Sequence, residues 1–278
     1  MQIGPYTLRI LDTGPLALDG GAMFGVVPRV LWERSHPPDS LNRIAMVSRV
    51  LLISAPGRKI LIDTGSGTKL TSRAADIYGV DRCRSDLRRV LRDAGTDPEE
   101  VTDVVLTHLH FDHAGGGTVR EGGEAVPAFP RAAYHVQREQ WNAALHPTER
   151  DRASYLPEDF LPLDRHGRLA LLDGEGELFP GIHIRVFHGH TAAMQCPVVS
   201  DGRTTLVHAA DLIPMTGHIR LPWIMAYDLQ PLVTLREKKA LLAEACEKEW
   251  MLFFQHDPRL SGAYVSEGEG GVELRPVP

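Results

Sequence analysis

The most constraining feature of this sequence lies between positions 104 and 116, where three histidines and one aspartate follow an apolar run. The run Val104-Val105-Leu106 predicts a buried strand, so the polar side chains after it project from one end of that strand. Imidazole nitrogens and carboxylate oxygens are the ligands that zinc and similar divalent metals prefer. Polar residues with a purely structural role would not be expected to place a carboxylate among three histidines at this spacing. The four residues are His108, His110, Asp112 and His113.

The spacing within this loop predicts two metal positions. His108 and His110 can turn to one side, whereas Asp112 and His113 turn toward a second position. Three later strands are also expected to end at polar side chains that can bind metal. These are 182–187 before His190, 204–207 before Asp211, and 250–254 before His256. Each candidate ligand therefore follows the carboxyl end of an expected strand.

The order of the expected elements indicates an α/β protein. Strands 47–54 and 59–62 flank a Pro-Gly turn and should form a hairpin. A helix is expected over 85–94 with Ser85 as its N-cap, and a Thr234-to-Glu237 capping box should open another. Strands and helices recur in both halves of the chain, a pattern that favours a sandwich of two sheets with helices outside.

Five segments together resemble the metallo-β-lactamase-fold hydrolases. The stretch from Asp211 to Pro258 is most similar to the quorum-quenching N-acyl-homoserine-lactone lactonases, and hydrolases of the methyl parathion type share many of these features. The resemblance implies a four-layer αββα sandwich. Because no linker-like segment divides the sequence, we expect one domain over residues 1–278. The five segments are 61–65, 107–116, 188–191, 208–211 and 253–257.

The same resemblance implies a complete set of metal ligands. A first metal would be held by His108, His110 and His190, and a second by Asp112, His113 and His256. Asp211 would bridge the two, and Asp63 would support the metal loop through hydrogen bonds. Zinc is the default for such ligands, although manganese, iron or cobalt can occupy them.

This ligand set predicts a hydrolase that needs no protein nucleophile. Two metals that share a water lower its pKa, so that hydroxide becomes available near neutral pH. Asp112 is expected to orient that hydroxide and to carry a proton to the leaving group. We expect hydrolysis of a lactone or carboxylic ester, with an N-acyl-homoserine lactone as one candidate. A phosphotriesterase is the nearest alternative, followed by an iron-dependent oxidoreductase of the same fold.

Two loop segments, 19–28 and 221–228, carry apolar and aromatic residues that could line a substrate pocket. An apolar wall next to a metal centre suits an acyl chain or an aromatic leaving group. Packing in the core is the competing interpretation. The candidate substrate-binding residues are Phe24, Trp223, Met225 and Tyr227.

Charge and composition narrow the set of partners. The net charge of −6 disfavours nucleic acid as a partner, and the arginines between 82 and 92 fit a solvated helix surface. The three cysteines form no Cys-x-x-Cys pair, no signal peptide is recognisable, and no apolar run is long enough to span a membrane. We expect a cytoplasmic enzyme with a small-molecule substrate and no membrane partner, and a homodimer is left open.

Overall fold

The structure is a computed structural model that describes residues 1–268 and 271–276. It divides into two compact units, each formed by two separate stretches of chain. We call residues 1–16 and 47–174 the N-terminal unit, and residues 17–46 and 175–278 the C-terminal unit. Strands β2 (Tyr6–Asp19) and β3 (Arg43–Ala55) contribute residues to both units. The single domain expected over 1–278 stays a prediction.

The N-terminal unit is built on a sheet with the strand order β1-β2-β3-β4-β5-β8-β9. Strand β4 is parallel to β5, β5 to β8, and β8 to β9. The carboxyl ends of these four strands therefore lie at one edge of the sheet, where the histidine-rich loop begins. The strands not yet delimited are β1 (Gln2–Ile3), β4 (Arg58–Ile62), β5 (Asp103–Val105), β8 (Ala133–Gln137) and β9 (Leu169–Leu172).

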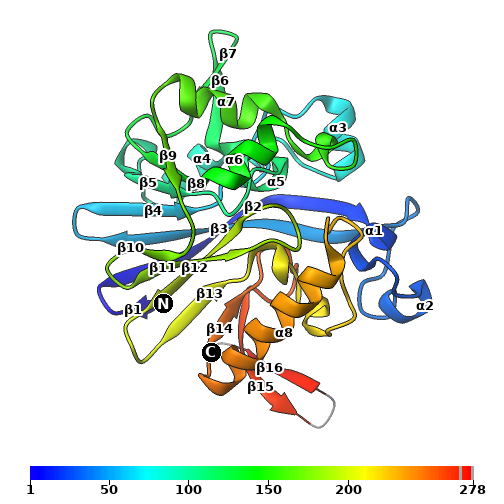
Figure 1. Ribbon diagram of the computed structural model, residues 1–278. Helices are drawn as coiled ribbons and strands as arrows, with labels where there is room; N and C mark the ends of the chain where they lie inside the picture. The colour runs from blue at the N-terminus through cyan, green and yellow to red at the C-terminus, as the bar shows by residue number, and fades with distance from the viewer. Residues whose placement is uncertain (269–270, 277–278) are drawn as a thin grey trace. The chain divides into compact units, whose positions relative to one another are not determined.

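Helices of the N-terminal unit gather on one side of strands β2–β4, where Figure 1 draws them in cyan and green. Their apolar faces join Leu52, Leu61 and Val104 of the sheet in a buried core with Leu91 and Phe160. A separate hairpin, β6 with β7, projects from this unit (Figure 1). The remaining elements are α3 (Ser72–Tyr78), α4 (Leu87–Asp93), η1 (Pro98–Glu100), α5 (Phe111–Ala114), η2 (Gly115–Gly117), β6 (Thr118–Glu121), β7 (Glu124–Pro127), α6 (Arg138–Leu145), η3 (Arg152–Ser154) and α7 (Pro157–Arg165).

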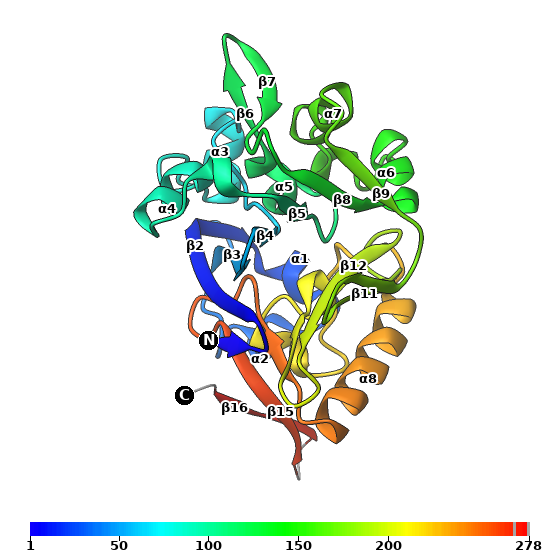
Figure 2. The ribbon, with the colours of Figure 1, turned by 90° about the vertical axis from the view of Figure 1, so that its left-hand side faces the viewer.

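The C-terminal unit contains a sheet whose strands follow one another in sequence order from β10 to β16. Within the described part of this sheet, β13 and β14 are the one parallel pair, and α8 lies between them in sequence and packs beside β15 (Figure 2). Val207, Leu252 and Phe254 form the buried core with Leu241 and Leu242 of α8. The elements are α1 (Gly20–Phe24), α2 (Arg29–Trp32), β10 (Gly176–Phe179), β11 (Ile182–Phe187), β12 (Met194–Ser200), β13 (Thr205–His208), η4 (Ala210–Leu212), η5 (Thr216–Ile219), α8 (Pro231–Glu247), β14 (Met251–Phe253), β15 (Gly262–Gly268) and β16 (Gly271–Pro276).

The predicted hairpin is confirmed, whereas two helix starts were wrong. Strands β3 and β4 pair antiparallel, with Ser54 opposite Lys59. Helix α4 begins one residue later than expected, because the Asp86 carboxylate caps it and the Ser85 hydroxyl donates to the carbonyl oxygen of Asp81. Within the described residues, no helix is long and apolar enough to cross a membrane.

Thr234 and Glu237 do not open helix α8. The helix starts four residues earlier than a Thr234 cap would allow, at Pro231, whose missing N–H costs nothing at a first position. The Glu237 carboxylate instead accepts hydrogen bonds from the backbone N–H groups of His188 and Gly189, at 2.8 and 2.9 Å. The acidic side chain therefore anchors the segment that leads to His190.

Candidate metal centre

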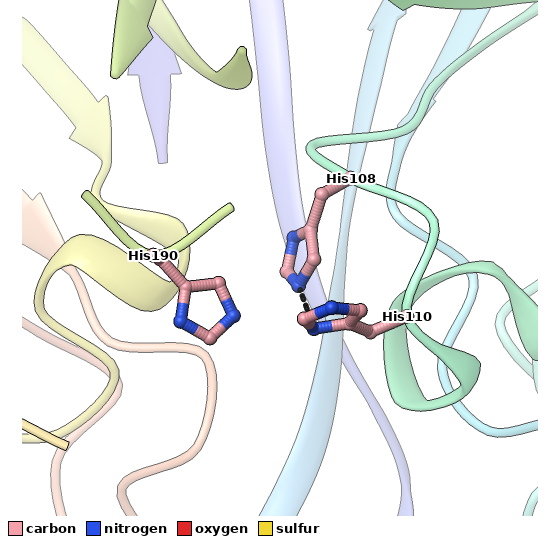
Figure 3. A group of neighbouring side chains, drawn as sticks. All are labelled: His108, His110 and His190. Carbon is pink, nitrogen blue, oxygen red and sulfur yellow. Dashed lines mark hydrogen bonds between the residues drawn. The ribbon is translucent and has the colours of Figure 1, made fainter. Parts of the chain in front are cut away.

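Two histidines of the N-terminal unit direct ring nitrogens at each other. Nε2 of His108 lies 3.0 Å from Nδ1 of His110, and the ring centroids are 4.5 Å apart (Figure 3). Both side chains are buried. At this distance one nitrogen can donate a hydrogen bond to the other, and the same pair of lone pairs could bind a divalent cation once the proton between them is lost. Figure 3 also draws His190, which belongs to the C-terminal unit.

The loop that carries these histidines packs backbone against backbone on the turn at 63–67. A Cβ atom added to Gly115 would lie 2.3 Å from the carbonyl oxygen of Ser66. A Cβ atom on Gly116 would lie 2.2 Å from the carbonyl oxygen of Thr64. Only glycine allows so close an approach, so the Gly-Gly pair after the ligands sets the position of the loop.

A buried lysine fixes the far end of the same loop. The ammonium of Lys69 donates to the carbonyl oxygens of Gly115 and Thr118, the latter at 2.8 Å. It also pairs with the Asp159 carboxylate of α7 at 3.0 Å. Burial raises the pKa of Asp159 to about 6, although the charge of Lys69 opposes that shift. Sequence reasoning assigned no role to this pair, whose members lie 90 positions apart.

Asp63 is joined to the histidine-rich loop at 107–116 through three buried contacts. Its Oδ1 accepts from the backbone N–H of Thr107 at 2.7 Å, and its Oδ2 accepts from the Thr107 hydroxyl at 2.8 Å. The same Oδ2 lies 2.8 Å from Nδ1 of His113. A carboxylate at Nδ1 favours the tautomer with its proton there, which leaves the Nε2 lone pair available to a metal. That Nε2 lies 3.8 Å from Oδ2 of Asp112.

The C-terminal unit places one carboxylate between two histidines. Oδ2 of Asp211 lies 3.3 Å from Nε2 of His190, and its Oδ1 lies 3.4 Å from Nε2 of His256. The three residues follow β11, β13 and β14, as expected from the sequence. Ala210, directly before Asp211, has a φ of +45°. A residue with a Cβ atom rarely adopts that conformation, so the surrounding structure holds the carboxylate in place at the cost of local strain.

A second carboxylate orients His190. Oδ1 of Asp228 lies 2.8 Å from Nδ1 of His190, and both side chains are buried. This contact parallels the one between Asp63 and His113, since a carboxylate at Nδ1 again leaves the Nε2 lone pair available to a metal. The sequence showed Asp228 only as part of the loop at 221–228. No spacing signal links it to a histidine 38 positions earlier.

The proposed substrate residues lie in two different environments. Phe24 is fully buried, with its ring 5.3 Å from Trp223 and 5.1 Å from His218 by centroid distance. The competing interpretation, core packing, therefore applies to Phe24. Trp223 and Met225 expose 7% and 4% of their surfaces and also belong to the core, whereas Tyr227 exposes 38%.

Other histidines have structural surroundings. His208 packs against Phe253 with ring centroids 4.9 Å apart. Nδ1 of His188 accepts from the backbone N–H of Ala193 at 3.3 Å. Burial lowers the pKa of His218 to about 3, and its Nε2 donates to the carbonyl oxygen of Met23 at 2.8 Å. His218 is therefore neutral in the folded protein at any ordinary pH.

Residues 44–256 match the family model of the metallo-beta-lactamase superfamily. The chain belongs to that superfamily. Its matched segment includes every candidate metal ligand and Asp63. The family and the α/β fold class expected from the sequence are thereby confirmed.

Two curated relatives resemble the chain over much of its length. An N-acyl homoserine lactonase of Bacillus thuringiensis is 26% identical over 179 residues, which cover 60% of each chain. The match thus spans about 60% of the length of that lactonase. A probable metallo-hydrolase of Mycobacterium tuberculosis is 25% identical over 86% of each chain.

The structural comparisons extend over the whole chain. A probable metal-dependent hydrolase from Staphylococcus aureus superimposes with a TM-score of 0.90 at 28% identity, covering 100% of both chains. AidC, a dizinc quorum-quenching lactonase, superimposes with a TM-score of 0.82 at 20% identity, covering 100% of this chain and 96% of its own. Both comparisons support the fold, and the family rests on the match over residues 44–256. These relatives are metal-dependent hydrolases, as the sequence resemblance implied.

Proposed function

We propose that this protein is a dinuclear metal-dependent hydrolase of lactones or carboxylic esters. The observation that carries the proposal is the Asp211 carboxylate, which has a histidine Nε2 at 3.3 Å from one oxygen and another at 3.4 Å from the other. A carboxylate with both oxygens directed in this way suits a bridge between two cations. The membership in the superfamily supports the same interpretation.

The donor set fits two divalent metals. His108, His110 and His190 would hold the first, and Asp112, His113 and His256 the second, with Asp211 between them. Imidazole and carboxylate donors favour zinc, and manganese, iron or cobalt remain compatible. Metals bound there would supply Lewis acidity and lower the pKa of a bound water.

The side chains of the protein would perform the remaining tasks. Asp63 and Asp228 hold the protons on Nδ1 of His113 and His190, so that each Nε2 can donate a lone pair. Asp112 would accept a proton from the attacking water and return it to the leaving oxygen of the ester. Tyr227 would donate a hydrogen bond to a substrate oxygen, because it is the exposed member of the proposed substrate residues.

Lactones and esters are favoured over phosphotriesters because several curated relatives are named N-acyl homoserine lactonases. The phosphotriesterase remains the alternative because one motif of this chain differs from that of the lactonases. Quorum-quenching lactonases commonly carry Gly-His-x-Pro-Gly-His, whereas this chain has Gly-His-Thr-Ala-Ala-Met from Gly189 to Met194. The cytoplasmic location and the homodimer stay predictions.

The test combines metal content with turnover. Plasma mass spectrometry on the purified protein should find two divalent metals per chain. Assays on a homoserine lactone, an aryl ester and a phosphotriester should rank the lactone or the ester first. Replacing Asp211 with Asn should remove both metal and turnover, whereas Asp201→Asn, in an exposed turn, should change neither. One iron per chain, oxygen consumption and no hydrolysis would favour the oxidoreductase instead.

A further inference from the structure

Helix α8 carries a buried cation that the proposed function does not use. Lys238 exposes 1% of its surface. Its ammonium donates to the carbonyl oxygen of Trp223 at 2.7 Å and to that of Arg220 at 3.1 Å. Among the described residues, no carboxylate oxygen lies within 4.0 Å of the Lys238 ammonium. Because a buried ammonium costs free energy, its presence there calls for a compensating negative charge.

The negative charge of the buried Asp228 carboxylate stabilises the charged form of Lys238. Burial lowers the pKa of Lys238 to about 8, and the charge of Asp228 opposes that shift. The Asp228 carboxylate uses Oδ1 for His190, while its Oδ2 meets no hydrogen-bond donor among the described residues. A buried carboxylate with one unpaired oxygen is stabilised by a cation at longer range. The two buried charges therefore complement each other without direct contact.

The same lysine also holds the loop that carries Asp228. The segment 220–228 begins at the two carbonyl groups bound by Lys238 and ends at the carboxylate bound to His190. Just beyond it, the backbone N–H of Leu229 donates to the carbonyl oxygen of His190 at 3.1 Å. A shift of the backbone near Lys238 would therefore also move Asp228 and, with it, the ring of His190.

We propose that Lys238 is a positioning residue for His190, acting through Asp228. Its ammonium compensates the buried carboxylate and fixes the loop, so that Asp228 stays on Nδ1 of His190 and Nε2 remains directed at the metal. The inference rests on the proposed function, because it assumes that His190 binds a metal. Sequence patterns offered no sign of it, since a lysine within an amphipathic helix is expected at the surface.

The experiment measures zinc affinity by competition with a chelator, on metal-free wild type and on Lys238→Met. Methionine keeps the approximate length of the side chain and removes its charge. We expect the dissociation constant of at least one zinc to rise about tenfold, at the lower end of the range for residues that support metal ligands. Lys248→Met, at an exposed lysine that directly follows the same helix, is the matched control and should leave both constants unchanged.

Two further measurements separate positioning from general stability. Urea unfolding of the metal-free variants reports the cost to the fold, and ring nitrogen-15 shifts of His190 report its tautomer. In the Asp228→Asn background, Lys238→Met should weaken zinc no further, because the path through Asp228 is already broken. Lys238→Gln, which keeps a donor for the two carbonyl groups, serves if the methionine variant does not fold.

The outcomes distinguish this inference from the proposed function. If wild type binds neither zinc nor manganese, iron or cobalt, the proposed function fails. If wild type binds two zinc ions and Lys238→Met binds them equally well, only the positioning role is overturned. An equal loss of affinity in both backgrounds would also overturn it, because Lys238 would then act independently of Asp228.

Discussion

Asp63→Asn should weaken metal binding far more than its small change in shape suggests. In the native chain, the carboxylate accepts from the backbone N–H and the hydroxyl of Thr107 and contacts Nδ1 of His113. Asparagine preserves the first contact through its Oδ1. Its amide nitrogen would then face Nδ1 of His113, which has to accept a hydrogen bond and give up its proton. The proton moves to Nε2, the nitrogen needed by the metal.

The magnitude follows from these contacts. The Thr107 hydroxyl can reverse and accept from the new amide, so one charge-assisted hydrogen bond is lost. That loss costs roughly 1.5–3 kcal/mol of unfolding free energy in the metal-free chain. Metal affinity should fall by about 10- to 100-fold, as is usual when the carboxylate partner of a metal-bound histidine is removed.

Two assays on the same samples check this expectation. Urea unfolding of the metal-free chain measures stability, and chelator competition measures zinc affinity. Asp86→Asn is the matched control, because asparagine caps a helix as well as aspartate does and should keep α4 intact. An Asp63→Asn protein with native zinc affinity would refute the tautomer argument, whatever its stability.

Three other changes test the packing around the site. Gly116→Ala places a Cβ atom 2.2 Å from the carbonyl oxygen of Thr64, so it should destabilise the fold by at least about 2 kcal/mol and reduce metal content. Gly176→Ala, which has open space around the added atom, is the control and should do neither. Equal urea midpoints for the two variants would contradict the close approach. His218 binds a proton near pH 6.5 when unfolded but only near pH 3 when folded, so its stabilising contribution is complete above pH 6.5 and is lost as the pH falls. Between pH 7 and pH 5 the loss from this group is about 2 kcal/mol, and unfolding of His218→Gln should lack that part of the slope; identical slopes would show that His218 titrates normally in the fold. Phe24→Ala removes a fully buried ring and should cost about 3–5 kcal/mol in urea unfolding, and a cost below about 1 kcal/mol would show that the ring is not part of the core.

The local part of the metal centre could be predicted from the sequence because its residues are neighbours along the chain. His108, His110, Asp112 and His113 follow one apolar strand within six positions, and their chemistry is that of a metal site in any fold that keeps the strand. The positions of later strands were predictable for the same reason. Residues 182–187 alternate, and the structure has β11 over those positions.

Helix starts were less predictable, because several nearby residues can cap the same helix. Ser85 and Asp86 are both good N-caps, and only the path of the chain decides that the Asp86 carboxylate faces the backbone N–H of Arg89. Glu237 does not cap helix α8, because its carboxylate accepts from the backbone N–H groups of His188 and Gly189 beyond the end of β11. Tertiary contacts outweighed a local preference worth about 1 kcal/mol.

The sequence alone therefore determined the fold class, the family and the chemistry of the ligands, since strand periodicity and ligand spacing are properties of short segments. Only the tertiary structure decided which buried charges meet. It brought Asp228 to His190 and placed Asp211 between two histidines. It also buried Lys238 of helix α8, a residue to which the sequence assigned no role. Electrostatic interactions depend on the distance between charges in space, and the separation of two residues along the chain does not reveal that distance.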